Sequence, residues 1–175
     1  MRSDEELLER ANRGDAEAFE ALYRRHRDWV YRLARRFTGN EPDALDVLQE
    51  TFAYLLRKLP GLHLTATMTS FLYPVVRHLS LNLRRKRAPS LADEELLDVV
   101  PAPPEAQTSR AELASALESL PADQREVVLL RFVDDLSLEE MAEMLKTPLN
   151  TVKSRLYRAL ESLREDPRTR DYFLG

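Results

Sequence analysis

The sequence predicts an all-α protein made of two small helical domains joined by a flexible acidic linker. Apolar residues recur at helical spacing along most of the 175 residues, and no segment shows the sustained alternation of a β-strand. This pattern breaks in residues 89–108, which contain four prolines and five acidic side chains. We therefore expect an N-terminal helical bundle in residues 1–88 and a second helical domain in residues 109–175.

The first two helices have clear starting signals. Ser3 and Glu6 form a capping box before the first helix, and Asp15 is placed to cap the second. The second helix is expected to end near Thr38, because Gly39 follows it. Trp29 lies beside the core stripe of this helix and is expected to pack. The stripe consists of Phe19, Tyr23, Val30, Leu33, Ala34 and Phe37.

Two further helices complete the N-terminal domain. The third is expected to begin near Pro42 and to end at Pro60. The fourth is expected from about Ser70 to Arg87, with Pro74 in its first turn, where a missing N–H costs little. The residues of the third helix that are predicted to face inward are Leu45, Leu48, Phe52 and Leu55 or Leu56.

The C-terminal domain is predicted to begin at Ser109, which forms a capping box with Glu112. A further capping box pairs Ser137 with Glu140, and Thr147 is expected to cap a helix that has a proline in its first turn. The predicted helices span about 110–120, 123–133, 138–145 and 148–164.

Several classes of protein are excluded by what the sequence lacks. It has no cysteine, so disulfides, thiolate zinc sites and cysteine nucleophiles are absent. No apolar run approaches the roughly 20 residues that cross a bilayer. The charged N-terminus has no apolar signal core, so we expect a cytoplasmic protein. The three histidines lack metal-ligand spacing, and no phosphate-binding or dinucleotide motif is present. We expect no enzyme activity, no metal and no cofactor.

The net charge of −4 conceals an uneven distribution. Residues 1–88 carry 16 basic and 12 acidic side chains, residues 89–112 carry 1 and 6, and residues 113–175 carry 9 and 12. An acidic middle segment therefore masks a basic N-terminal half. Local charge rather than total charge sets the affinity for a phosphate backbone, so a nucleic-acid partner remains compatible with the composition.

Residues 137–165 have the pattern of a short helix, a tight turn and a longer helix. In the longer helix, Val152, Leu156 and Leu163 belong to an apolar stripe, and Ser154 and Arg158 point away from it. Polar donors on the outer face and cations beside them suit the major groove of DNA. An ordinary antiparallel helix pair with a solvated outer face remains an alternative. The candidate DNA-binding residues are Asn150, Thr151, Lys153, Ser154, Arg155 and Arg158.

Two charged groups in the N-terminal domain also suggest binding surfaces. Asp46, Gln49 and Glu50 share one helical face, which is either a solvated face or a docking patch for a basic partner. A run of four cations, 84–87, ends the fourth helix. Interaction with the helix dipole explains one or two of these charges. A phosphate partner explains all four.

These motifs together resemble the extracytoplasmic-function group of bacterial RNA polymerase sigma factors, over about residues 15–165. The most specific stretch is Thr151-Val152-Lys153-Ser154-Arg155-Leu156. The sequence departs from the family at Asp135, Lys146 and Asn150, where glycine is frequent, and at Phe71, where tryptophan is usual. Other matching residues include Leu120-Pro121, Gln124-Arg125-Glu126-Val127, Leu138-Glu139-Glu140-Met141-Ala142 and Asp43-Ala44-Leu45-Asp46-Val47-Leu48-Gln49-Glu50.

The resemblance implies a transcription initiation factor with core RNA polymerase and promoter DNA as partners. Asp46, Gln49 and Glu50 would bind a coiled coil of the polymerase, and the loop 61–68 would hold an extruded base. The C-terminal helix-turn-helix would recognise the minus-thirty-five element. The N-terminal residues that would bind and open the minus-ten element are His63, Phe71, Tyr73, Arg77, His78, Asn82, Arg84, Arg85, Lys86 and Arg87.

The same resemblance implies an anti-sigma protein as a partner, no membrane insertion, and a monomer when the protein is alone. Its acidic linker would follow the RNA exit path, although a solubilising spacer remains an alternative. Two other functions are weighed. One is a sigma-like decoy or adaptor that binds an anti-sigma protein without directing transcription. The other is a plain transcriptional regulator, which would need a sensor domain that no segment supplies.

Overall fold

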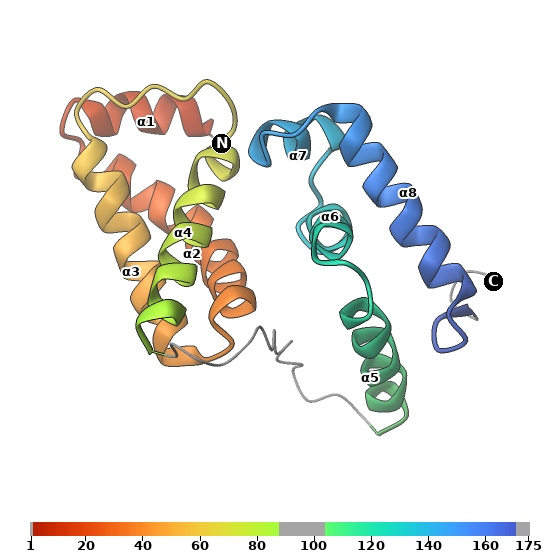
Figure 1. Ribbon diagram of the computed structural model, residues 1–175. Helices are drawn as coiled ribbons and strands as arrows, with labels where there is room; N and C mark the ends of the chain where they lie inside the picture. The colour runs from red at the N-terminus through yellow and green to blue at the C-terminus, as the bar shows by residue number, and fades with distance from the viewer. Residues whose placement is uncertain (1, 88–103, 171–175) are drawn as a thin grey trace. The chain divides into compact units, whose positions relative to one another are not determined.

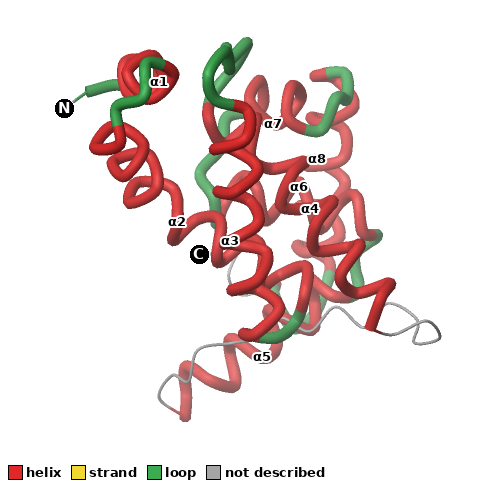
Figure 2. The backbone as a smooth tube through the Cα atoms, turned by 90° about the vertical axis from the view of Figure 1, so that its left-hand side faces the viewer, coloured by secondary structure: helices red, strands yellow, loops and turns green. Residues whose placement is uncertain are grey.

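The computed structural model describes residues 2–87 and 104–170, with side chains of the second range from residue 111 onward. The described residues form eight helices and no strand (Figure 2). The chain divides into two compact units, Met1–Leu96 and Leu97–Gly175, and we describe each by itself. The predicted all-α class is confirmed. Most of the predicted linker lies outside the described residues.

The first unit is a four-helix bundle, with helices α1 (Asp4–Asn12), α2 (Ala16–Thr38), α3 (Glu41–Lys58) and α4 (Met68–Arg87). The long helix α2 packs against each of the other three, and α3 also packs against α4 (Figure 1). The predicted caps at Ser3 and Asp15 are present, and Gly39 ends α2 in the left-handed conformation. Trp29 is buried, as expected. Fully buried side chains include Leu22, Val30, Leu33, Leu55, Leu72 and Val76.

The predicted inward face of α3 is correct at Phe52 and Leu55 and wrong at Leu45. Leu45 and Leu56 are 43% and 55% exposed. Thr51 takes an inward position because its hydroxyl donates to the Val47 carbonyl at 2.7 Å, which satisfies the buried oxygen. An apolar pattern does not select a buried threonine, so Thr51 was not predicted to face inward. The α3 side chains that are buried are Asp43, Ala44, Val47, Thr51, Phe52 and Leu55.

Helix α4 begins earlier than predicted. Met68 is its first residue, and the Thr67 hydroxyl accepts from the Ser70 N–H at 3.2 Å. Pro74 therefore lies inside the helix and not in its first turn, so the prediction for Pro74 is wrong. An interior proline removes one backbone hydrogen bond. The packing of α4 against α2 and α3 accommodates that loss.

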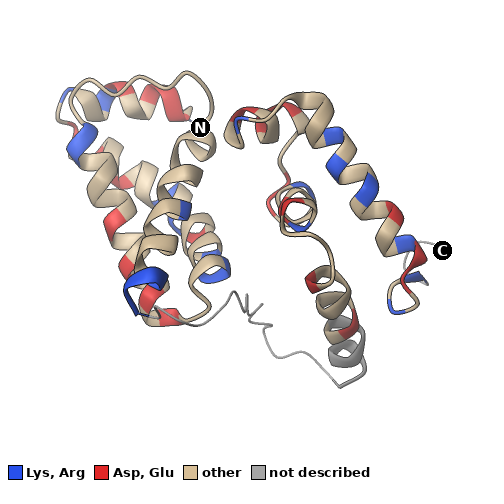
Figure 3. Cartoon of the chain, viewed as in Figure 1, with Lys and Arg blue, Asp and Glu red and all other residues tan. Residues whose placement is uncertain are grey.

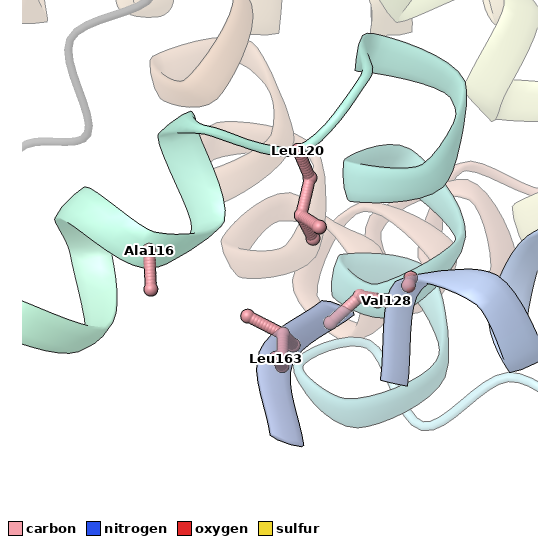
Figure 4. Packing of buried hydrophobic residues seen from close by; sticks show 5 residues of the cluster. Ala116, Leu120, Val128 and Leu163 are labelled. Carbon is pink, nitrogen blue, oxygen red and sulfur yellow. The ribbon is translucent and has the colours of Figure 1, made fainter. Parts of the chain in front are cut away.

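The second unit contains α5 (Pro104–Glu118), α6 (Ala122–Phe132), α7 (Leu138–Met144) and α8 (Leu149–Glu165). Helix α8 packs against both α6 and α7. Side chains from α5, the α5–α6 turn, α6 and α8 meet in one apolar cluster, and Leu117 and Leu156 pack against it (Figure 4). Among the described residues, no helix is long and apolar enough to cross a bilayer. The cluster consists of Ala116, Leu120, Val128, Ala159 and Leu163.

Two predicted caps in this unit are wrong. Helix α5 begins at Pro104, so Ser109 lies within it and cannot be its N-cap. Thr147 donates its hydroxyl to the Leu145 carbonyl at 3.1 Å, and Pro148 occupies the N-cap of α8 without a side-chain hydrogen bond. In contrast, the capping box at Ser137 is present.

Arg168 stabilises the segment that follows α8 in the second unit. Its guanidinium pairs with Asp166 at 2.6 Å and donates to the hydroxyls of Ser115 and Ser119. Hydrogen bonds from the Arg168 side chain and backbone N–H lower the pKa of the Asp166 carboxyl to about 2. These contacts join the residues after α8 to helix α5.

Candidate functional site

Helix α8 has an apolar inner face and a polar outer face. Val152, Ala159 and Leu163 are buried, whereas Lys153 and Arg158 are exposed and form no ion pair with another described residue. Figure 3 shows cations spaced along this helix. The predicted phase of α8 is therefore correct for these five residues. The exposed side chains also include Asn150 and Ser154.

A shallow hollow of about 300 Å³ lies on the outer face of α8. Tyr157, which the sequence analysis did not select, is 66% exposed and lines this hollow. Its position one turn after Lys153 is the signal that could have identified it. An exposed aromatic ring among donors can contact a thymine methyl group or a sugar. The other lining residues are Lys153, Ser154 and Arg158.

Two predicted residues of α8 are less available. Arg155 pairs with Asp123 of α6 at 3.1 Å, and its side chain is 30% exposed. Thr151 is half-buried in the first turn. The structure therefore separates the predicted set into an outer group and these two inner members.

The turn before α8 has a left-handed residue, Lys146, with φ of 50°. Asp135, before α7, has φ of 54°. Both are positions at which the sequence analysis noted a departure from a frequent glycine. The backbone therefore keeps a glycine-like conformation although a side chain is present, which is a source of local strain. Asn150 is different, because it is an ordinary residue of α8.

The acidic trio and the basic end of α4 lie together on the first unit. Asp46 and Glu50 have side chains that are 62% and 51% exposed, and Gln49 is also exposed. Arg87 pairs with the buried carboxylate of Asp43 and lies 3.7 Å from Asp46. Figure 3 shows the cations that end α4 beside acidic positions of α3. A groove of about 190 Å³ is lined by Asp46, Val47, Glu50, Leu79, Asn82, Leu83 and Lys86.

A larger, mainly apolar hollow of about 540 Å³ lies along α3 and α4. Phe71 stacks on Tyr54, with ring centroids 6.2 Å apart and planes inclined by 27°. The Lys58 ammonium lies 5.2 Å from the centre of the Tyr54 ring. Tyr54 was missed by the sequence analysis because it belongs to a different motif from Phe71. The lining residues are Tyr54, Ser70, Phe71, Pro74, Val75, His78 and Leu79.

Tyr73 is not available to bind DNA. It is only 2% exposed and packs edge-on against Phe37, with ring centroids 6.1 Å apart. The prediction for Tyr73 is therefore wrong, because its ring is part of the core. Arg84 is partly committed as well, since it donates to the Phe37 carbonyl at 3.3 Å.

Of the remaining predicted residues of the first unit, Phe71 and Asn82 are half-buried and the others are exposed. His63, Arg77 and His78 are exposed, as are Arg85 and Lys86. His78 and Asn82 are joined by a hydrogen bond of 2.9 Å along one face of α4. Within the described residues, no group of three or more histidine or carboxylate side chains is arranged to hold a metal ion.

Comparison with known proteins decides the family. The model described as "Sigma-70 region 2" matches residues 22–89, and that described as "Sigma-70, region 4" matches residues 110–163. The RNA polymerase sigma factor SigV of Bacillus subtilis is 34% identical over 140 residues, which cover 79% of this chain and 84% of SigV. This chain belongs to the RNA polymerase sigma factors.

Other similar proteins are extracytoplasmic-function sigma factors. SigM of Mycobacterium tuberculosis is 35% identical over 160 residues, which cover 90% of this sigma factor and 81% of SigM. A solved structure of CnrH in complex with the cytosolic domain of CnrY has a TM-score of 0.69 and 26% identity, covering 92% of this chain and 94% of CnrH. The predicted family is confirmed, and with it the class of transcription initiation factors.

The matched regions enclose the surfaces described above. Region 2 includes α3 and α4, and thus the acidic trio and the basic end of α4. Region 4 includes α6, α7 and most of α8. Helix α1 precedes the matched residues of this sigma factor, although it packs against α2.

Proposed function

We propose that this sigma factor binds core RNA polymerase through α3 and directs it to promoters with separate minus-ten and minus-thirty-five elements. The first unit would recognise and open the minus-ten element, and α8 would recognise the minus-thirty-five element. The observation that carries the proposal is the outer face of α8, where donors and cations lie opposite the buried residues Val152, Ala159 and Leu163.

The proposed polymerase-binding surface consists of Asp46, Gln49 and Glu50. All three are exposed on one face of α3. Two exposed carboxylates beside an amide complement a basic helical partner, because opposite charges steer association and fix its orientation.

The proposed minus-ten surface combines cations with rings. Arg85 and Lys86 would bind phosphates, while the stacked pair of Phe71 and Tyr54 offers an aromatic surface for an unpaired base. The exposed loop residue His63 would lie near an extruded base. Further members of the proposed surface are Arg77, His78, Asn82, Arg84 and Arg87.

On α8, Arg158 and Ser154 would contact base edges, whereas Lys153 would bind phosphate. All three side chains are exposed, and helical spacing places Ser154 opposite the buried stripe, Arg158 beside it and Lys153 at the flank. Asn150 and Tyr157 extend the same face. Arg155 would have to leave Asp123 to reach DNA.

Transcription in vitro with purified core polymerase and a pool of genomic promoter fragments tests this function. We expect a subset of promoters to be transcribed only when this chain is added. The absence of any transcript, with core polymerase shown to be active with another sigma factor, would overturn the proposal.

We also propose that an anti-sigma protein regulates this chain, since the similar CnrH was solved with the cytosolic domain of CnrY. A sigma-like decoy would bind such a partner and yet produce no transcript in the same assay. The exposed trio on α3 favours the initiation factor over the decoy, because a decoy has no need of a polymerase-binding surface.

A further inference from the structure

Asn12, the last residue of α1, holds the loop that connects α3 to α4. Its side-chain oxygen accepts from the N–H of Gly61 at 2.8 Å and from the N–H of Leu62 at 3.2 Å. Its side-chain nitrogen donates to the Leu62 carbonyl at 2.8 Å. One side chain therefore binds both backbone groups of Leu62 and fixes its orientation. Figure 1 shows this loop running beside α1.

The exposure of the loop side chains alternates after this anchor. Leu62, Leu64 and Ala66 are half-buried, whereas the side chains between them are exposed. The hold on Leu62 at the start of this segment therefore helps to fix which of the two sets faces outward. The exposed set consists of His63, Thr65 and Thr67.

Helix α1 is itself fixed at its other end, so it can act as a rigid support. The Asp4 carboxylate is hydrogen-bonded to the His26 ring of α2 at 2.8 Å and forms an ion pair with Arg25 at 2.5 Å. An anchor on a rigid helix positions a loop more accurately than an anchor on another loop.

We propose that Asn12 is a positioning residue for promoter recognition. It determines that His63 and Thr65, rather than their neighbours, face the minus-ten element. The inference rests on the proposed function, because it assigns the loop to base recognition. It adds a role for α1, which lies outside the residues that match region 2.

Two variants test the proposal. Asn12→Ala removes all three hydrogen bonds, and Asn12→Asp keeps the acceptor but places an oxygen against the Leu62 carbonyl. Arg10→Ala is the matched control, since it perturbs the same end of α1 through the Asp15 pair and contacts no loop residue. Full-length proteins are assayed with core polymerase on a promoter library randomised through the minus-ten element.

The loop-dependent positions are identified first with His63→Ala and Thr65→Ala. We expect Asn12→Ala to reduce base discrimination about tenfold at those same positions and to leave minus-thirty-five preference unchanged. Adding His63→Ala to Asn12→Ala should then reduce discrimination by less than the two single effects combined. Arg10→Ala should keep the wild-type preference.

A loss of activity that is uniform over all promoters, or equal for Asn12→Ala and Arg10→Ala, would show a merely structural role and overturn the inference. If Asn12→Ala does not fold, Asn12→Asp gives the same comparison. Amide hydrogen exchange gives a second readout, in which Gly61 and Leu62 exchange faster in Asn12→Ala while the α2 amides do not. Failure of the proposed function is distinguishable, because the wild-type protein would then transcribe no library member.

Discussion

The two candidate DNA-binding surfaces hold their cations in different ways. On α8, Lys153 and Arg158 are exposed and pair with no other described residue. At the end of α4, Arg84 donates to a backbone carbonyl, and Arg87 pairs with Asp43 and Asp46. Lys153 and Arg158 are therefore available without rearrangement, whereas Arg155 must leave Asp123. At the end of α4, Arg84 and Arg87 must exchange internal partners for phosphates, whereas Arg85 and Lys86 pair with no described residue.

This difference connects two roles within the first unit. Asp46 belongs to the proposed polymerase-binding surface and is also a neighbour of Arg87. A basic polymerase helix on Asp46 would remove that acceptor from Arg87. We expect docking to make Arg87 more available to DNA, whereas Lys153 and Arg158 need no such step.

The largest effect is expected from reversing the charge of the docking surface. Asp46→Lys combined with Glu50→Lys should abolish co-purification with core polymerase, because the steering charges become repulsive. Both side chains are exposed, so helicity should not change. The control is Glu20→Lys with Asp28→Lys, which makes the same charge change on exposed positions of α2. Wild-type binding by the first pair would remove α3 from the interface.

On α8, the outermost and lateral residues should behave differently. Arg158→Ala should cost about 1–3 kcal/mol on the preferred upstream element and relax preference at one or two bases. Lys153→Ala should weaken binding to all sequences and lower the salt slope by about one unit. Binding-site selection and salt titrations measure both. The reverse result, with Lys153→Ala changing preference and Arg158→Ala not, would show that another face contacts the bases.

The basic end of α4 should divide into two classes. Arg85→Gln with Lys86→Gln should lower the salt slope of promoter-complex affinity by about two units, since neither cation pairs with a described residue. Arg87→Gln should lower it by less than one unit, because phosphate binding by Arg87 replaces existing ion pairs. Equal slopes for single variants of all three cations would contradict the distinction between paired and unpaired cations at the end of α4.

The strained turn before α8 offers a smaller, stabilising change. Lys146→Gly should raise the free energy of unfolding of the second unit by about 0.5–1 kcal/mol, because glycine adopts a positive φ without steric cost. Urea denaturation followed by circular dichroism measures it. Lys153→Gly, inside α8, is the opposite control and should destabilise by a similar amount. Destabilisation by Lys146→Gly would show that this side chain supports the turn.

The smallest effect concerns pH and distinguishes the two units again. Burial lowers the pKa of His26 below its usual value, although Asp4 opposes this. The unfolded chain then binds more protons than the folded one below about pH 6.5, so the stability of the first unit falls as the pH is lowered through that range. Trp29, the single tryptophan, reports on this unit by fluorescence. His26→Gln should flatten the dependence, and a stability that rises on acidification would contradict it.

Much of the fold follows from local signals. Capping boxes at Ser3 and Ser137 and the glycine after Thr38 mark helix ends, because their side-chain or backbone conformations satisfy the end groups of a helix. The position of Pro74 was predicted wrongly, because proline in a helix interior is unfavourable locally and is tolerated only through tertiary packing. Composition also misplaced the start of α5, which lies among residues that look like linker.

Site residues were predicted correctly where the helical phase alone determines which side chains are exposed. The stripe on α8 is purely apolar, so Arg158 was assigned correctly to the outer face. On α4, Tyr73 matches the chemistry of base stacking, but its contact with Phe37 of α2 depends on tertiary structure. The stacking of Tyr54 on Phe71 and the hold of Asn12 on Leu62 join residues distant in sequence. No local sequence pattern predicts such contacts.

The most direct measurement is run-off transcription by core polymerase with this chain on one selected promoter, with the upstream and start-proximal elements changed separately. The account predicts transcript only when the chain is present, and its loss when either element is changed. It further predicts that Arg158→Ala no longer distinguishes upstream elements that differ at its contacted base, yet still distinguishes start-proximal ones. A chain that binds core polymerase but gives no promoter-dependent transcript would contradict the account.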